Sequence, residues 1–175
     1  MARARGFTLI ELLIVVAIIG IIAAIAVPAL LRARVSANEA AAVGDIRTVL
    51  SSEVAYQSTN GGYYDALTCL VSPSGGCVPG YPTDAPTFLD SVVGLVVAKQ
   101  GYQRYFAPGA APAPMPTTVS PSSILTYVYG GTPLSGNQTG VRGFAGDHSG
   151  RICQTPDGTD PAGGAATLPV TCLPI

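Results

Sequence analysis

The feature that most constrains this chain is an unbroken apolar run from Leu12 to Leu31, counting Gly20 and Pro28. These 20 residues form about 30 Å of helix, enough to cross the hydrocarbon core of a bilayer. A core helix of a soluble protein is disfavoured, because no other segment is apolar enough to surround it. The run predicts either a secretory signal, cleaved at Ala24-Ile25-Ala26, or a retained transmembrane helix over about residues 9–31.

One carboxylate, that of Glu11, stands at the start of this apolar run. A carboxylate costs about 2.5–3.5 kcal/mol at the centre of a membrane helix, and less near its end. A removable signal gains nothing from this cost, whereas a retained helix benefits if a positive charge lies nearby. Arg5 and a free chain amine are the two candidate partners, so Glu11 favours the retained helix.

Basic residues alone do not orient this span, because Arg3 and Arg5 precede it and Arg32 and Arg34 follow it. The four cysteines all lie beyond the span, and disulfides require an oxidising compartment. We therefore expect the N-terminus in the cytoplasm and the cysteine-bearing part of the chain outside it.

The residues around Glu11 form an ordered motif, Gly6-Phe7-Thr8-Leu9-Ile10-Glu11-Leu12-Leu13. This motif resembles the cleavage and methylation site of type IV pilins and of the related type II secretion pseudopilins. The resemblance implies that a prepilin peptidase removes the leader, residues 1–6, by cutting between Gly6 and Phe7, and then N-methylates Phe7. It also implies that the helix is retained, and that Glu11 pairs during assembly with the Phe7 amine of a neighbouring subunit or of its own chain.

The helix is expected to continue well past the apolar run, over residues 7–58, and to stop before Asn60-Gly61-Gly62. Its second half is amphipathic and must therefore lie on the rest of the chain. By the same resemblance, the stretch between Gly20 and Pro28 can lose helical order in a filament. Alternatively, the helix simply tolerates both residues, as many transmembrane helices do.

The remaining residues, 59–175, are predicted to form a loop-rich body, since the chain contains 21 Gly and 15 Pro. A short helix is expected after Asp84, and Ala107 to Pro121 is expected to be an exposed polyproline-like loop. Strand patterns occur at residues 102–106, 124–129, 141–145 and 151–153. Together with the long helix, they predict an α+β fold with a three- to four-stranded antiparallel sheet, which is the pilin arrangement.

Four cysteines in an exported, loop-rich body indicate two disulfides. Three connectivities are possible, and the close spacing favours Cys69–Cys77 with Cys153–Cys172. The second bond would close the C-terminal loop 153–172, which matches the position where pilins often carry a disulfide.

No catalytic residue, metal site or cofactor is predicted. His148 is the only histidine, and the common nucleophile, zinc-protease and phosphate-loop motifs are absent from the sequence. Asp157 and Asp160 are weak calcium candidates, more readily explained as turn formers. A net charge of −1 offers no field for nucleic acid, and we find no nucleic-acid motif.

These features favour a structural subunit of a type IV pilus that is not an enzyme. It would wait in the inner membrane as a single-pass precursor with its body in the periplasm, and then enter an extracellular pilus. Its partners would be copies of itself, the prepilin peptidase and the pilus assembly platform. A type II secretion pseudopilin remains an alternative within the family. A secreted soluble binding domain is an alternative of another class, but it leaves Glu11 unexplained.

Overall fold

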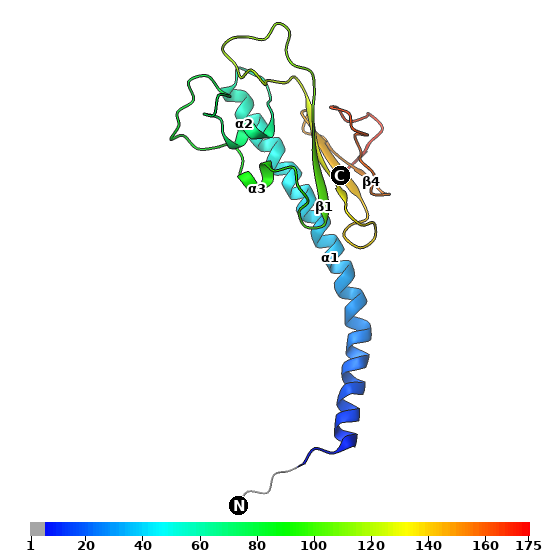
Figure 1. Cartoon of the computed structure of the whole chain (residues 1–175). Helices are drawn as coiled ribbons and strands as arrows, with labels where there is room; N and C mark the ends of the chain where they lie inside the picture. The colour runs from blue at the N-terminus through cyan, green and yellow to red at the C-terminus, as the bar shows by residue number, and fades with distance from the viewer. Residues whose placement is uncertain (1–5) are drawn as a thin grey trace, which may run out of the picture. The chain divides into compact units, whose positions relative to one another are not determined.

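The computed structural model describes residues 6–175, so the predictions made on Arg3 and Arg5 and on leader residues 1–5 lie outside the described part of the chain. The chain divides into two compact units, Met1–Arg34 and Val35–Ile175. Helix α1, Leu9–Thr59, contains 51 residues and contributes to both (Figure 1). We describe each unit by itself and call the second unit the body.

In the first unit, α1 is continuous and every apolar side chain from Leu9 to Leu31 is exposed. The most apolar 18-residue window of α1 has a mean hydropathy of 3.1, and none of it is buried. By length and composition, α1 is able to cross a membrane.

In the body, the second half of α1 is amphipathic, as predicted. Its buried apolar residues are Ile46, Val49, Leu50 and Tyr56, which recur at intervals of one, three and six and share one face. The helix ends at Thr59, where Asn60 is followed by Gly61 and Gly62, both with positive φ. These two glycines supply the left-handed backbone that commonly terminates a helix.

The sheet of the body is antiparallel and has five strands in the order β1-β2-β3-β4-β5. The strands are β1 Tyr102–Pro108, β2 Tyr127–Pro133, β3 Gly143–Asp147, β4 Ile152–Thr155 and β5 Leu173–Pro174. The predicted α+β class is therefore confirmed, but the expected strand number of three or four is too low. The additional strand, β5, has two residues, which are too few to show an alternation of apolar and polar side chains. It directly follows the disulfide-bonded Cys172.

The predicted strand at residues 124–129 is displaced, because β2 begins at Tyr127 and continues through Gly130 and Gly131. Glycine normally weakens a strand, but at Gly130 the absence of a side chain allows the Tyr105 side chain to approach the backbone closely. A Cβ at Gly130 would lie 2.4 Å from the hydroxyl oxygen of Tyr105 on β1. The Tyr105 side chain thus occupies the space above Gly130, and strand pairing continues past it.

Two short helices lie between α1 and the sheet in sequence. Helix α2, Leu67–Val71, was not predicted, whereas α3, Ser91–Gly94, is the short helix expected after Asp84. Helix α3 is one turn long and is capped by the preceding Asp90, whose Oδ1 accepts a hydrogen bond of 2.7 Å from the Val92 N–H.

Both faces of the sheet are covered. On one face, Tyr127 and Tyr129 pack in the same cluster as Ile46 and Leu50 of α1. A Cβ at Gly146 would lie 2.7 Å from Cγ2 of Ile46, so β3 approaches α1 closely because it carries glycine there. On the other face is a second cluster that includes Cys153 and residues of the C-terminal loop; its buried members are Val128, Ala145, Cys153, Ala162 and Leu168.

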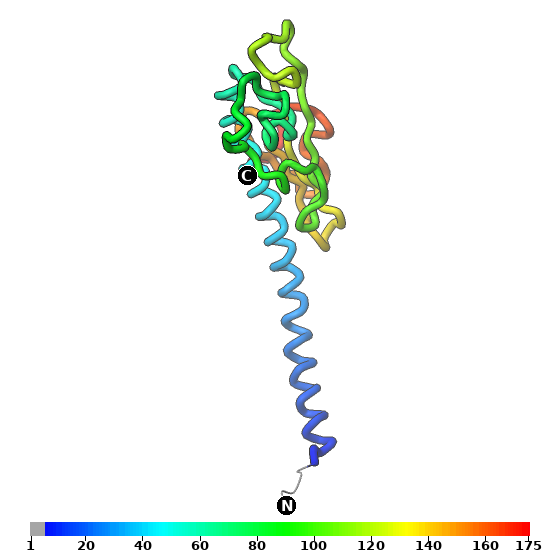
Figure 2. Tube along the Cα trace, turned by 60° about the vertical axis from the view of Figure 1, so that its left-hand side comes forward, coloured from blue at the N-terminus to red at the C-terminus, as the bar shows by residue number. Residues whose placement is uncertain are grey.

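The proline-rich loop between β1 and β2 lies beside the end of α1, as Figures 1 and 2 both show. Asn60 anchors it, because its Oδ1 accepts a hydrogen bond of 2.8 Å from the Ser120 N–H. Its Nδ2 donates to Ser123 Oγ at 2.8 Å. Thr117 and Thr118 are exposed, whereas Ser120 is buried.

Candidate processing and assembly site

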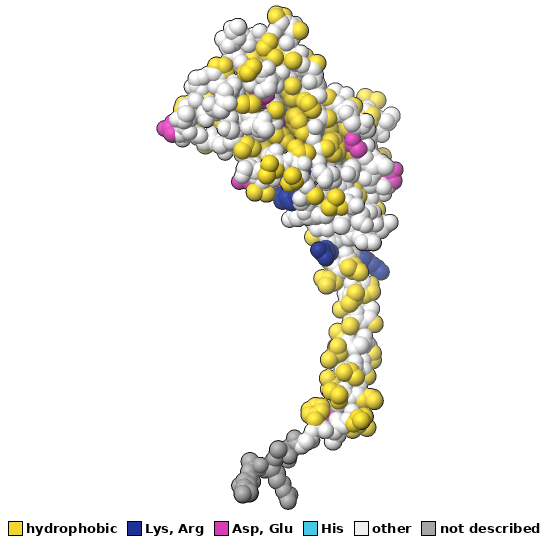
Figure 3. All heavy atoms as spheres, in the orientation of Figure 1, with side chains coloured by type: hydrophobic (Ala, Val, Ile, Leu, Met, Phe, Trp, Pro, Cys, Tyr) yellow, Lys and Arg dark blue, Asp and Glu magenta, His cyan; other side chains and the backbone are white. Residues whose placement is uncertain are grey.

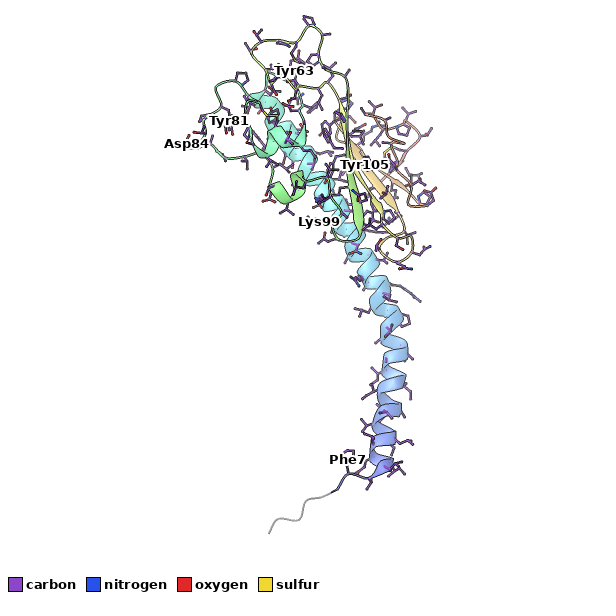
Figure 4. All side chains as sticks on the ribbon, in the orientation of Figure 1. Phe7, Tyr63, Tyr81, Asp84, Lys99 and Tyr105 are labelled. Carbon is purple, nitrogen blue, oxygen red and sulfur yellow. A yellow bond between two sulfur atoms is a disulfide. The ribbon has the colours of Figure 1, made fainter. Side chains whose placement is uncertain are left out.

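The predicted cleavage site lies outside the helix. Gly6, Phe7 and Thr8 are non-helical and exposed, and α1 begins at Leu9. Phe7 precedes the first turn of the helix, and 76% of its surface is exposed (Figure 4). The peptide bond between Gly6 and Phe7 is therefore presented in a segment without helical hydrogen bonds.

Thr8 and Glu11 form a capping box at the start of α1. The Glu11 N–H donates to Thr8 Oγ1 at 3.3 Å, and the Thr8 N–H donates to Glu11 Oε2 at 2.9 Å. The Thr8 hydroxyl also donates to the same oxygen at 2.6 Å. This reciprocal arrangement satisfies backbone donors that the first helical turn leaves without partners.

The capping box gives Glu11 a partner that the charge argument overlooked. Of the two cationic candidates, Arg5 lies outside the described residues, and the Phe7 amine would exist only after cleavage. The signal was present in the sequence, since Thr8 and Glu11 have the threonine-x-x-glutamate spacing of a capping box. Thr8 is therefore a site residue that the sequence analysis missed.

Helix α1 is uninterrupted through Gly20 and Pro28 in the single chain. Nothing lies within 4 Å of the position that a Cβ would take at Gly20. No packing contact within residues 6–175 therefore requires glycine there, and a loss of helical order between Gly20 and Pro28 in a filament remains a prediction.

Both cysteine pairs that spacing favoured are joined in the structure. Cys69, in α2, bonds to Cys77, and the two Cα atoms are 5.5 Å apart. Cys153, in β4, bonds to Cys172, with a Cα separation of 5.6 Å. The second bond holds the C-terminal loop against the outer face of the sheet, since Cys153 is almost fully buried.

The two calcium candidates hold turns in place. Asp157 Oδ1 accepts hydrogen bonds from the Thr159 N–H and hydroxyl, at 3.1 and 2.7 Å. Asp160 accepts from the Tyr105 hydroxyl and from the N–H groups of Ala162 and Gly164. Within residues 6–175, no group of three or more His, Cys, Asp or Glu side chains is arranged to hold a metal ion.

Two clusters of ion pairs join the second half of α1 to the rest of the body. Glu39 accepts from the Arg142 guanidinium at 2.5 and 3.0 Å and from the backbone N–H groups of Val141 and Arg142. Burial alone would raise the pKa of Glu39, but these hydrogen bonds outweigh it and lower the pKa. Asp45 pairs with Lys99 at 2.8 Å and with Arg104 at 3.6 Å.

Another buried carboxyl group, that of Glu53, faces no cation among the groups around it. Its side chain is fully buried on α1. The Oε2 atom accepts a hydrogen bond of 3.4 Å from the Asp65 N–H, whereas the Oε1 atom has no hydrogen-bond partner among the described residues. Burial raises the pKa of Glu53 to about 8; the Asp65 N–H opposes this shift, whereas the Asp65 carboxylate adds to it. Asp65 in turn accepts a 2.7 Å hydrogen bond from the Tyr56 hydroxyl. Glu53 is therefore a protonated core residue near neutral pH.

Comparison with known proteins agrees with the geometry at the start of α1. Residues 1–27 match the family model described as the prokaryotic N-terminal methylation motif. The chain carries this motif. The match includes Gly6, Phe7 and Glu11, and it ends one residue before Pro28.

Two curated proteins are similar to part of the chain. The type IV wide pilus major component PilA4 of Thermus thermophilus is 43% identical over 72 residues, which are 41% of this chain and 55% of that protein. The type IV major pilin protein PilA of Myxococcus xanthus is 41% identical over 84 residues, which are 47% of this chain and 38% of that protein. The chain therefore spans about half or less of these relatives. No solved structure matches it significantly.

These matches confirm the resemblance to type IV pilins at the level of sequence similarity. Both relatives are named as major components of pili, and neither name describes an enzyme.

Proposed function

We propose that this chain is a structural subunit of a type IV pilus that polymerises through the first half of α1. The observation that carries the proposal is the exposure of every apolar side chain from Leu9 to Leu31, directly after a methylation motif. Such a surface is stable only in lipid or against other apolar helices. The inner membrane provides the lipid environment for the precursor, and a helical bundle of subunits provides the apolar helices after assembly.

In this proposal, the prepilin peptidase cuts between Gly6 and Phe7 and methylates the new amine. The leader is residues 1–6. The helix predicted over residues 7–58 is α1, which begins two residues later, at Leu9, because Thr8 caps it, and ends at Thr59. The body lies in the periplasm before assembly. The pilus assembly platform then moves the subunit from the inner membrane into an extracellular filament. Extension of the filament is taken up between Gly20 and Pro28.

Cleavage changes the electrostatics around Glu11, because it creates a cationic amine on Phe7. In a bundle of α1 helices, the Glu11 carboxylate of one subunit meets the Phe7 amine of another. At an effective dielectric constant of about 20, two unit charges 4 Å apart attract by roughly 4 kcal/mol before desolvation is counted. A helix packed out of register leaves both charges in an apolar environment, so this pair selects the register of assembly.

The intact mass of the chain in filaments sheared from cells tests the proposal. We expect the loss of Met1 to Gly6, a gain of about 14 Da for one methyl group and a loss of about 4 Da for two disulfides. A chain beginning at Val27 would instead identify a secreted soluble domain. A processed chain recovered only from the cell envelope, with none in the sheared fraction, would favour a type II secretion pseudopilin.

A further inference from the structure

A ridge of exposed apolar side chains stands on α3 and the residues that follow it. Its members, called the α3 ridge below, are Val92, Leu95, Val96 and Val97, and Leu95 is 59% exposed. Hydrophobic atoms gather at this place in Figure 3, beside a basic side chain. Asp90 lies at the start of α3 and makes no ion pair among the described residues. Exposed apolar side chains that adjoin one another indicate an interaction surface.

The α3 ridge is held outward by a buried arginine. The Arg104 side chain is 4% exposed and donates to the carbonyl oxygens of Val97 and Val92, each at 2.9 Å. Asp45 of α1 lies 3.6 Å from the same guanidinium. The backbone at both ends of the ridge is therefore held by a buried, charged side chain.

A groove of complementary character lies elsewhere on the body, between α1 and β3. It has a volume of about 260 Å³, and we call it the α1 groove. Val43, Phe144 and the C-terminal Ile175 supply its apolar surface, and Arg47 and Arg142 line it as cations. Arg142 is occupied by Glu39, whereas the exposed Arg47 makes no ion pair among the described residues.

The α3 ridge and the α1 groove match in size and in charge. An apolar cavity of about 150 Å³ accommodates a guest the size of benzene, so the groove has room for a leucine and an adjoining valine side chain. The ridge carries the unpaired acid Asp90, and the groove carries the unpaired base Arg47. An apolar contact with opposite charges at its edge is the usual anatomy of a protein interface.

We propose that the α3 ridge of one copy of this chain docks into the α1 groove of a second copy. The inference rests on the proposed function and adds to it a contact between bodies. Because the ridge and the groove are different surfaces of the same chain, each copy can insert its ridge into one neighbour and receive the ridge of another neighbour in its groove. Such a heterologous contact generates an open helical array when the rotation between copies does not close a ring.

Charge placed on the ridge tests the contact. Leu95→Glu is expected to reduce the yield of sheared filaments at least tenfold, because docking would bury an unpaired carboxylate. Leu134→Glu is the matched control, since Leu134 is 57% exposed and lies in neither surface. Filament yields that are equal for the two variants would overturn the inference. Absence of filaments from the unmodified chain would instead contradict the proposed function itself.

A cysteine pair provides a second test that does not depend on filament yield. Leu95→Cys combined with Arg47→Cys is expected to give a ladder of disulfide-linked chains in sheared filaments on a non-reducing gel. Leu134→Cys combined with Arg47→Cys is expected to give none. Filaments of the first double variant that run as single chains would overturn the proposed docking.

Discussion

The two halves of α1 form one continuous helix but differ in burial: the first half is exposed and the second half is packed against the sheet. Up to Leu31 its apolar side chains are exposed. The side-chain hydrogen bonds described in this half join Thr8 and Glu11 at the start of the helix. From Glu39 onward it buries apolar residues against the sheet and fastens itself with ion pairs. The second half is therefore satisfied by its own chain. In the proposed function, lipid or other subunits cover the first half, so changes there should alter assembly and leave the body unaffected.

The largest effect is expected from Glu11→Gln, which removes the charge but keeps an oxygen that can complete the capping box. Filament yield should fall more than tenfold, because the variant cannot form the charge pair that we propose between Glu11 and the Phe7 amine. Unfolding of the body by denaturant, measured on the purified chain in detergent, should not change.

Thr8→Val is the matched variant for Glu11→Gln, because it removes the cap and keeps the charge. It is expected to cost about 0.5–2 kcal/mol at the helix start and to leave filament yield within a few-fold of normal. Should Thr8→Val abolish filaments while Glu11→Gln assembles, capping rather than charge would be the role of Glu11.

The next largest effect belongs to the body. Replacing both Cys153 and Cys172 by serine opens a loop of 19 residues and is expected to lower the free energy of unfolding by about 3 kcal/mol. Denaturant unfolding in detergent measures the change. The first half of α1 should be unaffected, so membrane insertion of the precursor serves as the control. A body as stable as the unmodified one would contradict the role given to this bond.

A pH-dependent effect on the body is expected from Glu53. Its pKa is raised to about 8 in the folded body, against an ordinary value of 4.5. The folded state therefore holds a proton that the unfolded state releases between these values, and stability is lost as pH rises from about 4.5 to 8. The slope is at most about 1.4 kcal/mol per pH unit.

Glu53→Gln should remove this slope, as denaturant midpoints measured from pH 5 to pH 8 will show. Asp157→Asn is a suitable control, because Asp157 is exposed and lies on a turn far along the chain. An unchanged slope in Glu53→Gln would mean that other groups govern the pH dependence.

The smallest effects should come from two helical glycines, one in each half of α1. Neither Gly20 nor Gly44 has any atom within 4 Å of the position of an added Cβ. Alanine at either position should favour the helix by about 0.5–1 kcal/mol. Gly44→Ala should raise the free energy of unfolding of the body by that amount.

Gly20→Ala should instead leave the body unchanged and increase the force needed to stretch a single filament, measured with optical tweezers. If Gly20→Ala filaments stretch as easily as unmodified ones, the segment from Gly20 to Pro28 is not where extension occurs.

Local signals in the sequence were sufficient for much of the fold. The apolar run predicted a long helix, Asn60-Gly61-Gly62 predicted its end within about a residue, and cysteine spacing favoured the observed pairs. The alternation around Tyr127, Val128 and Tyr129 correctly indicated a strand with opposite faces in different environments. These features depend on neighbours in sequence, which is why they were readable.

The features that were missed depend on contacts between distant residues. Strand β5 has two residues and pairs because a disulfide places it beside β4, and β2 passes through glycines because Tyr105 lies above them. The partners of Glu39, at Val141 and Arg142, are more than 100 positions away. Thr8 is different, since its capping spacing was legible and was overlooked in favour of a charge argument.

The position of the capping box separates maturation from folding. Both of its residues lie after the Gly6–Phe7 bond, at which we propose cleavage, and neither Gly6 nor Phe7 belongs to the helix. Removing the leader therefore breaks none of the hydrogen bonds that start α1, and a precursor can complete its body and wait uncut. In the proposed function, cleavage and methylation alter only the end of the chain, so a cell that holds folded precursors can commit each one to assembly by modifying that end alone.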